Sequence, residues 1–232
     1  SKTSESQTDN SFQEQSMLAV LYTQTSAEFV ANNIQVYNNA IKAIDKALED
    51  TTWTAAQEQK GDFASKRPAI IIDVDETVLD NTAFQARTIL EGFSYPEGWI
   101  EWGLEGSAEA VAGVSKFLTY ADQKGVKIFY VTNRVSELEE STKKNLKNLN
   151  LPFDEDTDVL LMKGENGWTS DKVARRLLVS SEYRIILLVG DQLTDFISSK
   201  EATLEDASRK ALASKYQNMW GSKWFMITNP MY

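Results

Sequence analysis

Short apolar runs that alternate with stretches of helical periodicity constrain the fold of this 232-residue chain more than any other feature. Each run ends in a polar residue; they are AIIID from Ala69, VKIFYVTN from Val126, YRIILLVGD from Tyr183 and KWFMITNP from Lys223. Helical patterns separate them at residues 108–124, 137–149 and 171–178. Strands that alternate with helices form a parallel sheet with right-handed crossovers, so the sequence predicts an α/β fold.

Two further segments extend this pattern. Apolar residues recur at helical spacing between Leu18 and Leu48, which predicts one long or two shorter helices within residues 17–60 that pack on the rest of a domain spanning 17–232. Residues 1–16 are polar and are expected to form a flexible leader. Residues 82–106 are too many for a simple crossover loop and too apolar for a linker, so we expect a small inserted cap there.

Composition excludes several kinds of chemistry. The formal net charge of −10 disfavours a nucleic-acid polymer as partner, because the field of the whole molecule repels phosphate chains. The chain has no cysteine and no histidine, which removes disulfides, thiolate nucleophiles, the commonest general base and the commonest zinc ligand. Catalysis would therefore depend on carboxylates, lysines, hydroxyls or a metal ion bound through oxygen.

The polar residues at the ends of the runs are expected to lie together. Ligands of parallel α/β sheets bind outside the carboxyl ends of the strands. Asp73, Thr132, Asn133 and Asp191 each end or follow a predicted strand, so all four should face one crevice. The cap predicted at residues 82–106 would cover that crevice.

The stretch IIIDVDETVLDN crowds four carboxylates at the end of a strand, where like charges repel. A divalent cation would relieve this repulsion, and hard oxygen ligands suit Mg²⁺. In the chemistry that this favours, Asp73 attacks phosphorus and forms an aspartyl-phosphate, while Asp75 protonates the leaving oxygen and later activates water. Aspartates at strand ends also cap turns, which is the alternative interpretation of this stretch.

Other residues would complete such a site. A phosphoryl group in transfer needs donors around its peripheral oxygens, and Thr132, Asn133 and Lys172 supply them. Thr and Asn also end strands without any function, and a helical lysine is usually a solvated charge. In LLVGDQLTDF, Gly190 allows a tight turn and Asp191 and Asp195 stand four residues apart.

The order DVDET, VTNR, Lys172, GDQLTDF resembles the haloacid dehalogenase superfamily, which implies a Rossmann-like parallel sheet with helices on both faces and an aspartate nucleophile. More narrowly, IIIDVDETVLDN with LLVGDQLTDF is similar to the class C bacterial acid phosphatases, the lipoprotein nucleotide-phosphatase group. The likeness extends from the N-terminal helices to Tyr232. Superfamily dehalogenases lack a second aspartate at the position of Asp75, so the resemblance favours a phosphoryl substrate.

The resemblance assigns roles by motif position. It implies that Asp73 is nucleophile and Mg²⁺ ligand, that Asp75 is general acid/base and a ligand through its backbone carbonyl, and that Asp191 is the third protein ligand. Asp195 would orient Lys172 or metal-bound water.

Substrate contacts are also implied. Thr132 and Lys172 would hold the phosphate, with Asn133 beside them. Trp99 matches the position where the family stacks its substrate, and the terminal Tyr232 is a second candidate for stacking. These rings would alternatively hold the cap on the core, and Arg134 would either reach substrate or pair with a helix carboxylate.

The sequence thus predicts a Mg²⁺-dependent acid phosphatase that hydrolyses small phosphomonoesters, namely nucleotides and aryl phosphates. The alternatives are a phosphatase of sugar or other small phosphates and a non-catalytic surface binding protein on the same fold. The resemblance further implies a periplasmic or outer-membrane location, a homodimer and a lipid anchor in the precursor, although this chain has no cysteine to carry the lipid.

Overall fold

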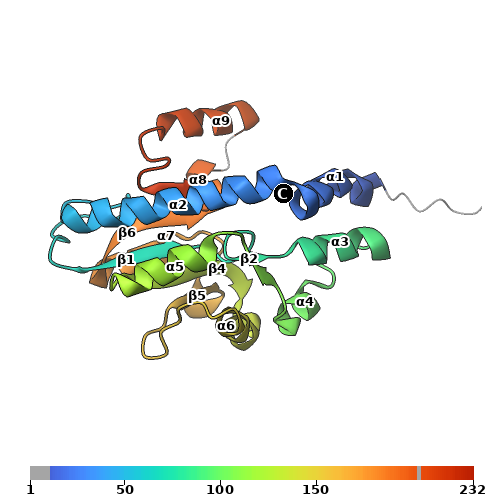
Figure 1. Ribbon diagram of the computed structural model, residues 1–232, viewed down its shortest axis with the longest axis horizontal. Coiled ribbons are helices and arrows are strands. Elements are labelled where there is room, and N and C mark those ends of the chain that lie inside the picture. The colour runs from blue at the N-terminus through green and yellow to red at the C-terminus, as the bar shows by residue number, and fades with distance from the viewer. Residues whose placement is uncertain (1–10, 203–204) are drawn as a thin grey trace, which may run out of the picture.

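A parallel sheet forms the centre of the protein. The computed structural model describes residues 11–202 and 205–232, and within them five parallel strands run in the order β5-β4-β1-β6-β7 (Figure 1). The strands of this sheet are β1 (Arg67–Ile72), β4 (Lys127–Val135), β5 (Leu160–Lys163), β6 (Tyr183–Gly190) and β7 (Trp224–Met226). The prediction of an α/β fold with a parallel sheet is confirmed.

Helices occupy most of the remaining chain. The α-helices of the described residues are α1 (Ser11–Thr25), α2 (Ala27–Glu49), α3 (Thr82–Glu91), α4 (Trp99–Glu105), α5 (Val114–Gln123), α6 (Glu139–Asn148), α7 (Val173–Glu182), α8 (Ser199–Ala202) and α9 (Asp206–Lys215). The short 3₁₀ turns are η1 (Ser136–Leu138), η2 (Glu165–Gly167) and η3 (Leu193–Asp195). None of the described helices has the length and apolar character needed to cross a lipid bilayer.

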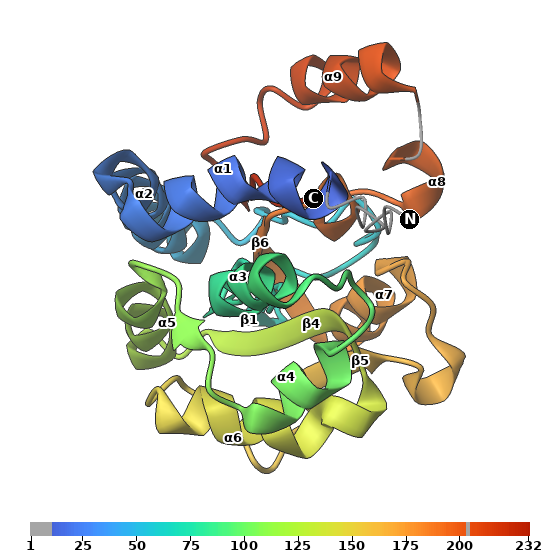
Figure 2. The same cartoon turned by 90° about the vertical axis from the view of Figure 1, so that its right-hand side faces the viewer.

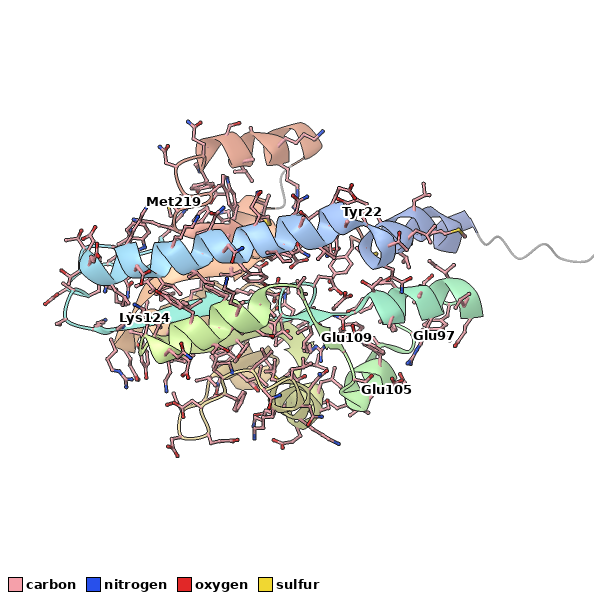
Figure 3. All side chains as sticks on the ribbon, in the orientation of Figure 1. Tyr22, Glu97, Glu105, Glu109, Lys124 and Met219 are labelled. Atoms are coloured by element: carbon pink, nitrogen blue, oxygen red, sulfur yellow. The ribbon has the colours of Figure 1, made fainter. Side chains whose placement is uncertain are left out.

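The sheet is buried on both faces because successive residues of a strand point to opposite sides. In β1, Ile70 and Ile72 belong to the core that includes α2 and α5. Ala69 and Ile71 belong to a second core that includes residues of α7, α9 and β7. Figure 1 shows α2 and α5 side by side along the sheet, and the end of α5 is tied to α2 by an ion pair of 3.2 Å between Lys124, labelled in Figure 3, and Asp45.

Several predicted boundaries differ from the structure. Strand β5 was not predicted, because VLLMK is short and follows a run of acidic residues. Helix α5 begins at Val114 rather than at residue 108, since residues 109–110 form strand β3 and Gly113 adopts a positive φ of 94°. The N-terminal helices end at Glu49, not at residue 60. Of the predicted leader, residues 11–16 are helical and residues 1–10 lie outside the described part of the chain.

The segment predicted as a cap contains helices α3 and α4, which lie at the end of the molecule that faces the viewer in Figure 2. A two-stranded antiparallel pair, β2 (Leu79–Asp80) and β3 (Glu109–Ala110), joins the entry of this segment to its exit. An exposed ion pair between Arg87 and Glu105, the latter labelled in Figure 3, connects the two helices.

Helix α2 supports the loop that follows β1. The hydroxyl of Tyr37, which is fully buried, donates a hydrogen bond of 2.6 Å to the carbonyl oxygen of Thr77. Thr77 lies within DVDET, so this contact holds the backbone next to the crowded carboxylates. The N-terminal helices are therefore part of the body of the domain.

We predict that Tyr37→Phe lowers the free energy of unfolding by about 1–3 kcal/mol, because a buried carbonyl loses its donor. Urea denaturation measures this as a lower midpoint with an unchanged slope. Tyr120→Phe is the matched control, since its hydroxyl contacts only the half-exposed carboxylate of Asp45 at 2.7 and 2.8 Å. Its loss should stay below about 1 kcal/mol. Equal losses in the two variants would contradict the role given to Tyr37.

Candidate active site

The carboxyl ends of the central strands bring the predicted residues to one place. Asp73 follows β1, Thr132 and Asn133 belong to β4, and Asp191 follows β6. A cavity of about 590 Å³ opens there, and its wall includes both core carboxylates and cap aromatics. Of the predicted site residues, the wall contains Asp73, Asp75, Trp99, Asn133, Arg134, Lys172, Asp191, Asp195 and Tyr232.

Lys172 lies at the centre of the site. It occupies the N-cap position of α7, is 4 % exposed, and its Nζ donates to Asp73 and, at 2.6 Å, to Oδ1 of Asp195. A buried ammonium with two carboxylate partners is compensated in charge, whereas a lone one would not be. The prediction that Asp195 orients Lys172 agrees with this contact.

Burial and mutual repulsion perturb the acids around Lys172. Burial raises the pKa of Asp73 well above its usual range, and the negative charges of Asp195, Asp191 and Asp75 add to the rise while Lys172 opposes it. Burial alone would lower the pKa of Lys172, yet Asp195 and Asp73 raise it above the ordinary lysine value. The lysine therefore stays charged, while burial and mutual repulsion oppose full ionisation of the acids around it.

The turn after β6 is built around Asp195. Its Oδ2 accepts hydrogen bonds from the backbone N–H groups of Asp191 at 3.1 Å and Gln192 at 2.9 Å. A Cβ at position 190 would lie 2.2 Å from the same oxygen, so only glycine allows this close approach. Asp191 is thereby directed into the cavity, where Asn229 donates to its Oδ2 at 2.7 Å.

Burial also raises the pKa of Asp191 to about 8, with a further contribution from Asp195. The pKa of Glu76 rises to about 8 as well, through burial and then through repulsion from Asp75. Glu76 was quoted in the carboxylate-rich stretch but received no role, and Asn229 was not predicted at all. The position of Asn229 just after the last strand was the available signal.

Asp75 is held by Arg134. The guanidinium is 2 % exposed and contacts Oδ1 of Asp75 through Nε at 2.9 Å and Nη2 at 2.8 Å. Its Nη1 donates to Thr142 at 3.1 Å. The predicted pairing of Arg134 with a helix carboxylate is not the one seen, because the guanidinium pairs with a carboxylate of the DVDET motif. Arg134 also lines the cavity, so its predicted contact with substrate stays a prediction.

Thr132 and Asn133 have different environments. Thr132 is fully buried, and its hydroxyl accepts from the backbone N–H of Arg134 at 3.0 Å and lies 3.5 Å from Oδ2 of Asp75. The side chain of Asn133 is exposed in part, and its oxygen accepts from the buried Arg175 at 2.8 Å. Arg175 also donates to the Thr132 carbonyl at 2.5 Å, which fixes the end of β4.

Aromatic rings from the cap form one side of the cavity. Trp99 packs edge-on against Phe84 and Tyr95, with ring centroids 5.2 and 5.9 Å away, and the Arg134 guanidinium lies 5.6 Å from its ring. Tyr232 lines the same cavity, and its hydroxyl is hydrogen-bonded to Glu76. Trp99 is therefore both a cavity wall and a packing element of the cap.

The donor set suits a hard cation. Asp73, Asp191 and Asp195 each offer a carboxylate oxygen, and these oxygens lie within 4.8 Å of one another. Both oxygens of Asp195 already accept hydrogen bonds, from Lys172 and from two backbone N–H groups, which leaves Asp73 and Asp191 as the better ligands. All-oxygen donors of this kind favour Mg²⁺ over softer metals.

Comparison with known proteins places the chain in a family. Residues 2–232 match the model of the HAD superfamily, subfamily IIIB (acid phosphatase). The structure is similar to the class C acid phosphatase from Bacillus anthracis, with a TM-score of 0.82 and 34 % identity over 95 % of this chain and 86 % of that one. A second structure of the Bacillus anthracis enzyme, with tungstate bound, matches with the same values.

These matches decide between an enzyme and a non-catalytic binding protein on the same fold, in favour of the enzyme. They also agree with the motif resemblance, which was based on two stretches of the sequence only. The chain belongs to subfamily IIIB of the HAD superfamily, the acid phosphatases, and is a phosphomonoester hydrolase.

Proposed function

We propose that the protein hydrolyses nucleotides and aryl phosphates with the help of Mg²⁺ and through an aspartyl-phosphate on Asp73. The observation that supports this most is the arrangement at the end of β1. Asp73 lines the cavity beside the charged Lys172. The second carboxylate, Asp75, lies two residues further along the chain and is held by Arg134. A nucleophile and a separate proton donor are the two groups that this reaction needs.

In the first step, a carboxylate oxygen of Asp73 attacks phosphorus and the bond from phosphorus to the ester oxygen breaks. Asp75 gives its proton to the departing oxygen, so the alcohol leaves neutral. In the second step, Asp75 removes a proton from water, and the water oxygen attacks phosphorus and releases inorganic phosphate with Asp73 restored. Lys172 would neutralise charge on the peripheral oxygens, together with the amide of Asn133.

Mg²⁺ would be held by Asp73 and Asp191, and by the backbone carbonyl of Asp75 that the motif implies. When bound, it would neutralise charge on the phosphoryl oxygens and on the crowded acids. Asp195 would keep its contacts with Lys172 and the turn after β6. The raised pKa values of Asp73 and Asp191 come first from burial and then from neighbouring acids, and a bound cation would favour the charged form of both.

The cap aromatics favour a substrate with a planar group. Trp99 and Tyr232 line the same cavity as Asp73, and bases and aryl rings stack on such side chains. A sugar phosphatase is the second candidate, since the wall also carries the polar groups Gln85, Thr88 and Ser94. The periplasmic or outer-membrane location, the lipid anchor and the homodimer stay predictions from the resemblance.

We predict that Asp73→Asn lowers kcat with 4-nitrophenyl phosphate more than about 10³-fold, because the amide is not a nucleophile. Circular dichroism should show an unchanged fold, since the shape is kept. Asp154→Asn is the matched control; Asp154 pairs with Lys127, does not line this cavity, and its variant should retain activity. Substantial turnover by pure Asp73→Asn protein would exclude the aspartyl-phosphate route.

The effect of Mg²⁺ on the thermal stability of the protein should depend on pH. The folded-state pKa values of Asp191 and Glu76, each about 8, exceed their unfolded values, so these groups favour the folded state at low pH. That contribution is lost as pH rises through the folded pKa. We predict that the melting temperature in EDTA falls between about pH 5 and about pH 8, and that Mg²⁺ raises it more at the higher pH.

Asp191→Asn is the matched variant for this measurement. It should flatten the fall in melting temperature and remove most of the increase caused by Mg²⁺, because it lacks the group that titrates and binds. Differential scanning fluorimetry with and without EDTA at both pH values is sufficient. A Mg²⁺ effect that is equal at both pH values, or retained in Asp191→Asn, would contradict this metal site.

Trp99→Ala separates the two substrate classes. Stacking of a base on an aromatic ring contributes about 1–3 kcal/mol, so kcat/KM for a nucleoside monophosphate should fall about 5- to 100-fold. A hexose phosphate should lose less than about twofold, since it has no planar aromatic ring to stack. Leu104→Ala on the same helix is the control, because Leu104 is exposed and does not line the cavity. Equal losses for both substrates would mean that Trp99 only supports the cap.

A further inference from the structure

Asn81 has a buried side chain with no role in the chemistry described so far. It is 0 % exposed and occupies the N-cap position of α3, where asparagine usually accepts a hydrogen bond from the helix backbone. Here it makes no such cap bond; Asp80 accepts from the backbone N–H of Thr82 instead, at 2.7 Å. The usual structural reason for asparagine at this position is therefore absent.

The amide of Asn81 instead joins the cap to Asp75. Its Nδ2 donates to Oδ1 of Asp75 at 2.9 Å, and its Oδ1 accepts from Nε1 of Trp102 in α4 at 2.8 Å and from Arg134 at 3.3 Å. Indole and guanidinium groups can only donate, so the amide oxygen must face them. The NH₂ group is thereby left to face Asp75, and the orientation of the amide is determined.

The two carboxylate oxygens of Asp75 therefore have different hydrogen-bond partners. Oδ1 accepts from Asn81 and from two nitrogens of Arg134, at 2.8 to 2.9 Å. Among the described residues, Oδ2 has a single long contact of 3.5 Å, with the hydroxyl of Thr132. An oxygen that accepts three hydrogen bonds is poorly placed to carry a proton, whereas Oδ2 is free to do so.

We infer that Asn81 is a positioning residue: with Arg134 it holds Oδ1 of Asp75, so that Oδ2 carries the proton to the leaving oxygen, and Trp102 makes this orientation depend on the cap. The inference rests on the proposed function, in which Asp75 is the general acid. In the transfer, the O–H bond at Oδ2 breaks as the new bond to the ester oxygen forms. The electrons of the phosphorus–oxygen bond go to that oxygen.

A pair of substrates isolates this role. Benzyl phosphate releases an alkoxide that must be protonated, whereas 4-nitrophenyl phosphate releases a stable phenolate that leaves without a proton. Both carry one aromatic ring, so stacking in the cavity affects them similarly. The quantity to compare is kcat/KM, since it reports transfer to Asp73 and the departure of the leaving group, not the later hydrolysis.

For Asn81→Ala we predict that kcat/KM falls about 10- to 100-fold for benzyl phosphate and less than about threefold for 4-nitrophenyl phosphate. Asn81→Asp, which keeps the size but has no N–H to donate, should show the same selectivity and serves if the alanine variant does not fold. Trp102→Phe keeps an aromatic side chain but loses the N–H donor, and should lower kcat/KM for benzyl phosphate about 2- to 10-fold.

Asn145→Ala is the matched control. Asn145 is an equally buried asparagine, and its amide bonds only to the backbone of Ala108, at 2.8 and 3.1 Å. Loss of an amide with a merely structural role should change kcat/KM for both substrates by the same factor. The inference would be overturned if both Asn81 variants lost kcat/KM equally for the two substrates, or lost none for either substrate.

Asp75→Asn distinguishes this failure from failure of the proposed function. It should lower kcat/KM for benzyl phosphate about 10²- to 10⁴-fold and kcat/KM for 4-nitrophenyl phosphate far less. If Asp75→Asn is selective and the Asn81 variants are not, only the role of Asn81 is wrong. If the wild-type protein hydrolyses neither ester, or Asp75→Asn is not selective, the general-acid step itself is wrong and the inference falls with it.

Discussion

The contact of Lys172 with two aspartates is the interaction on which the rest of the site depends. One buried ammonium joins Asp73, at the end of β1, to Asp195, in the turn after β6, from the first position before α7. Three elements that are distant in the sequence therefore meet at one charge. Because Asp195 also accepts two backbone N–H groups, the lysine indirectly holds the turn that presents Asp191. Removal of Lys172 would leave two buried carboxylates without their cation.

Arg134 has a corresponding position beside Asp75 and also lines the cavity. Its guanidinium is buried with Asp75 and Asn81, so Asp73 and Asp75 contact different cations. Asp73 lies beside Asp191 and Asp195 as well as Lys172, whereas Asp75 lies beside Glu76 and is held by Arg134 and Asn81. In the proposed function, Asp73 as nucleophile lies among the oxygen ligands of the metal ion, and Asp75 as proton donor is oriented by hydrogen bonds from Arg134 and Asn81.

Features with a local signal were predictable from the sequence, and features that depend on packing were not. The strands β1, β4, β6 and β7 could be recognised because each is a compact apolar run, and parallel topology then places Asp73, Asn133 and Asp191 at one edge. Strand β5 was missed because its short apolar run directly follows the acidic residues of DEDTD. The partner of Arg134 was missed for a different reason, since a long side chain reaches many acids and its sequence position does not choose among them. The role of Asn81 depends on Trp102, 21 residues away, and no local pattern links the two.

The pairing of β2 with β3 at the base of the cap has a consequence for how this fold diversifies. Leu79 faces Ala110 and Asp80 faces Glu109, so the chain leaves the core and re-enters it at adjacent points. The intervening residues can lengthen, shorten or change without shifting the sheet, because the closure of the excursion is maintained by backbone hydrogen bonds rather than by side chains. In the proposed function, Trp99 of this segment contacts the substrate while Asp73 and Asp191 follow strands of the sheet, so the cap can vary without changing these two carboxylates. Asn81, just before the cap, accepts a hydrogen bond from Trp102 within it. A different cap would therefore have to place an indole or another hydrogen-bond donor within reach of Asn81.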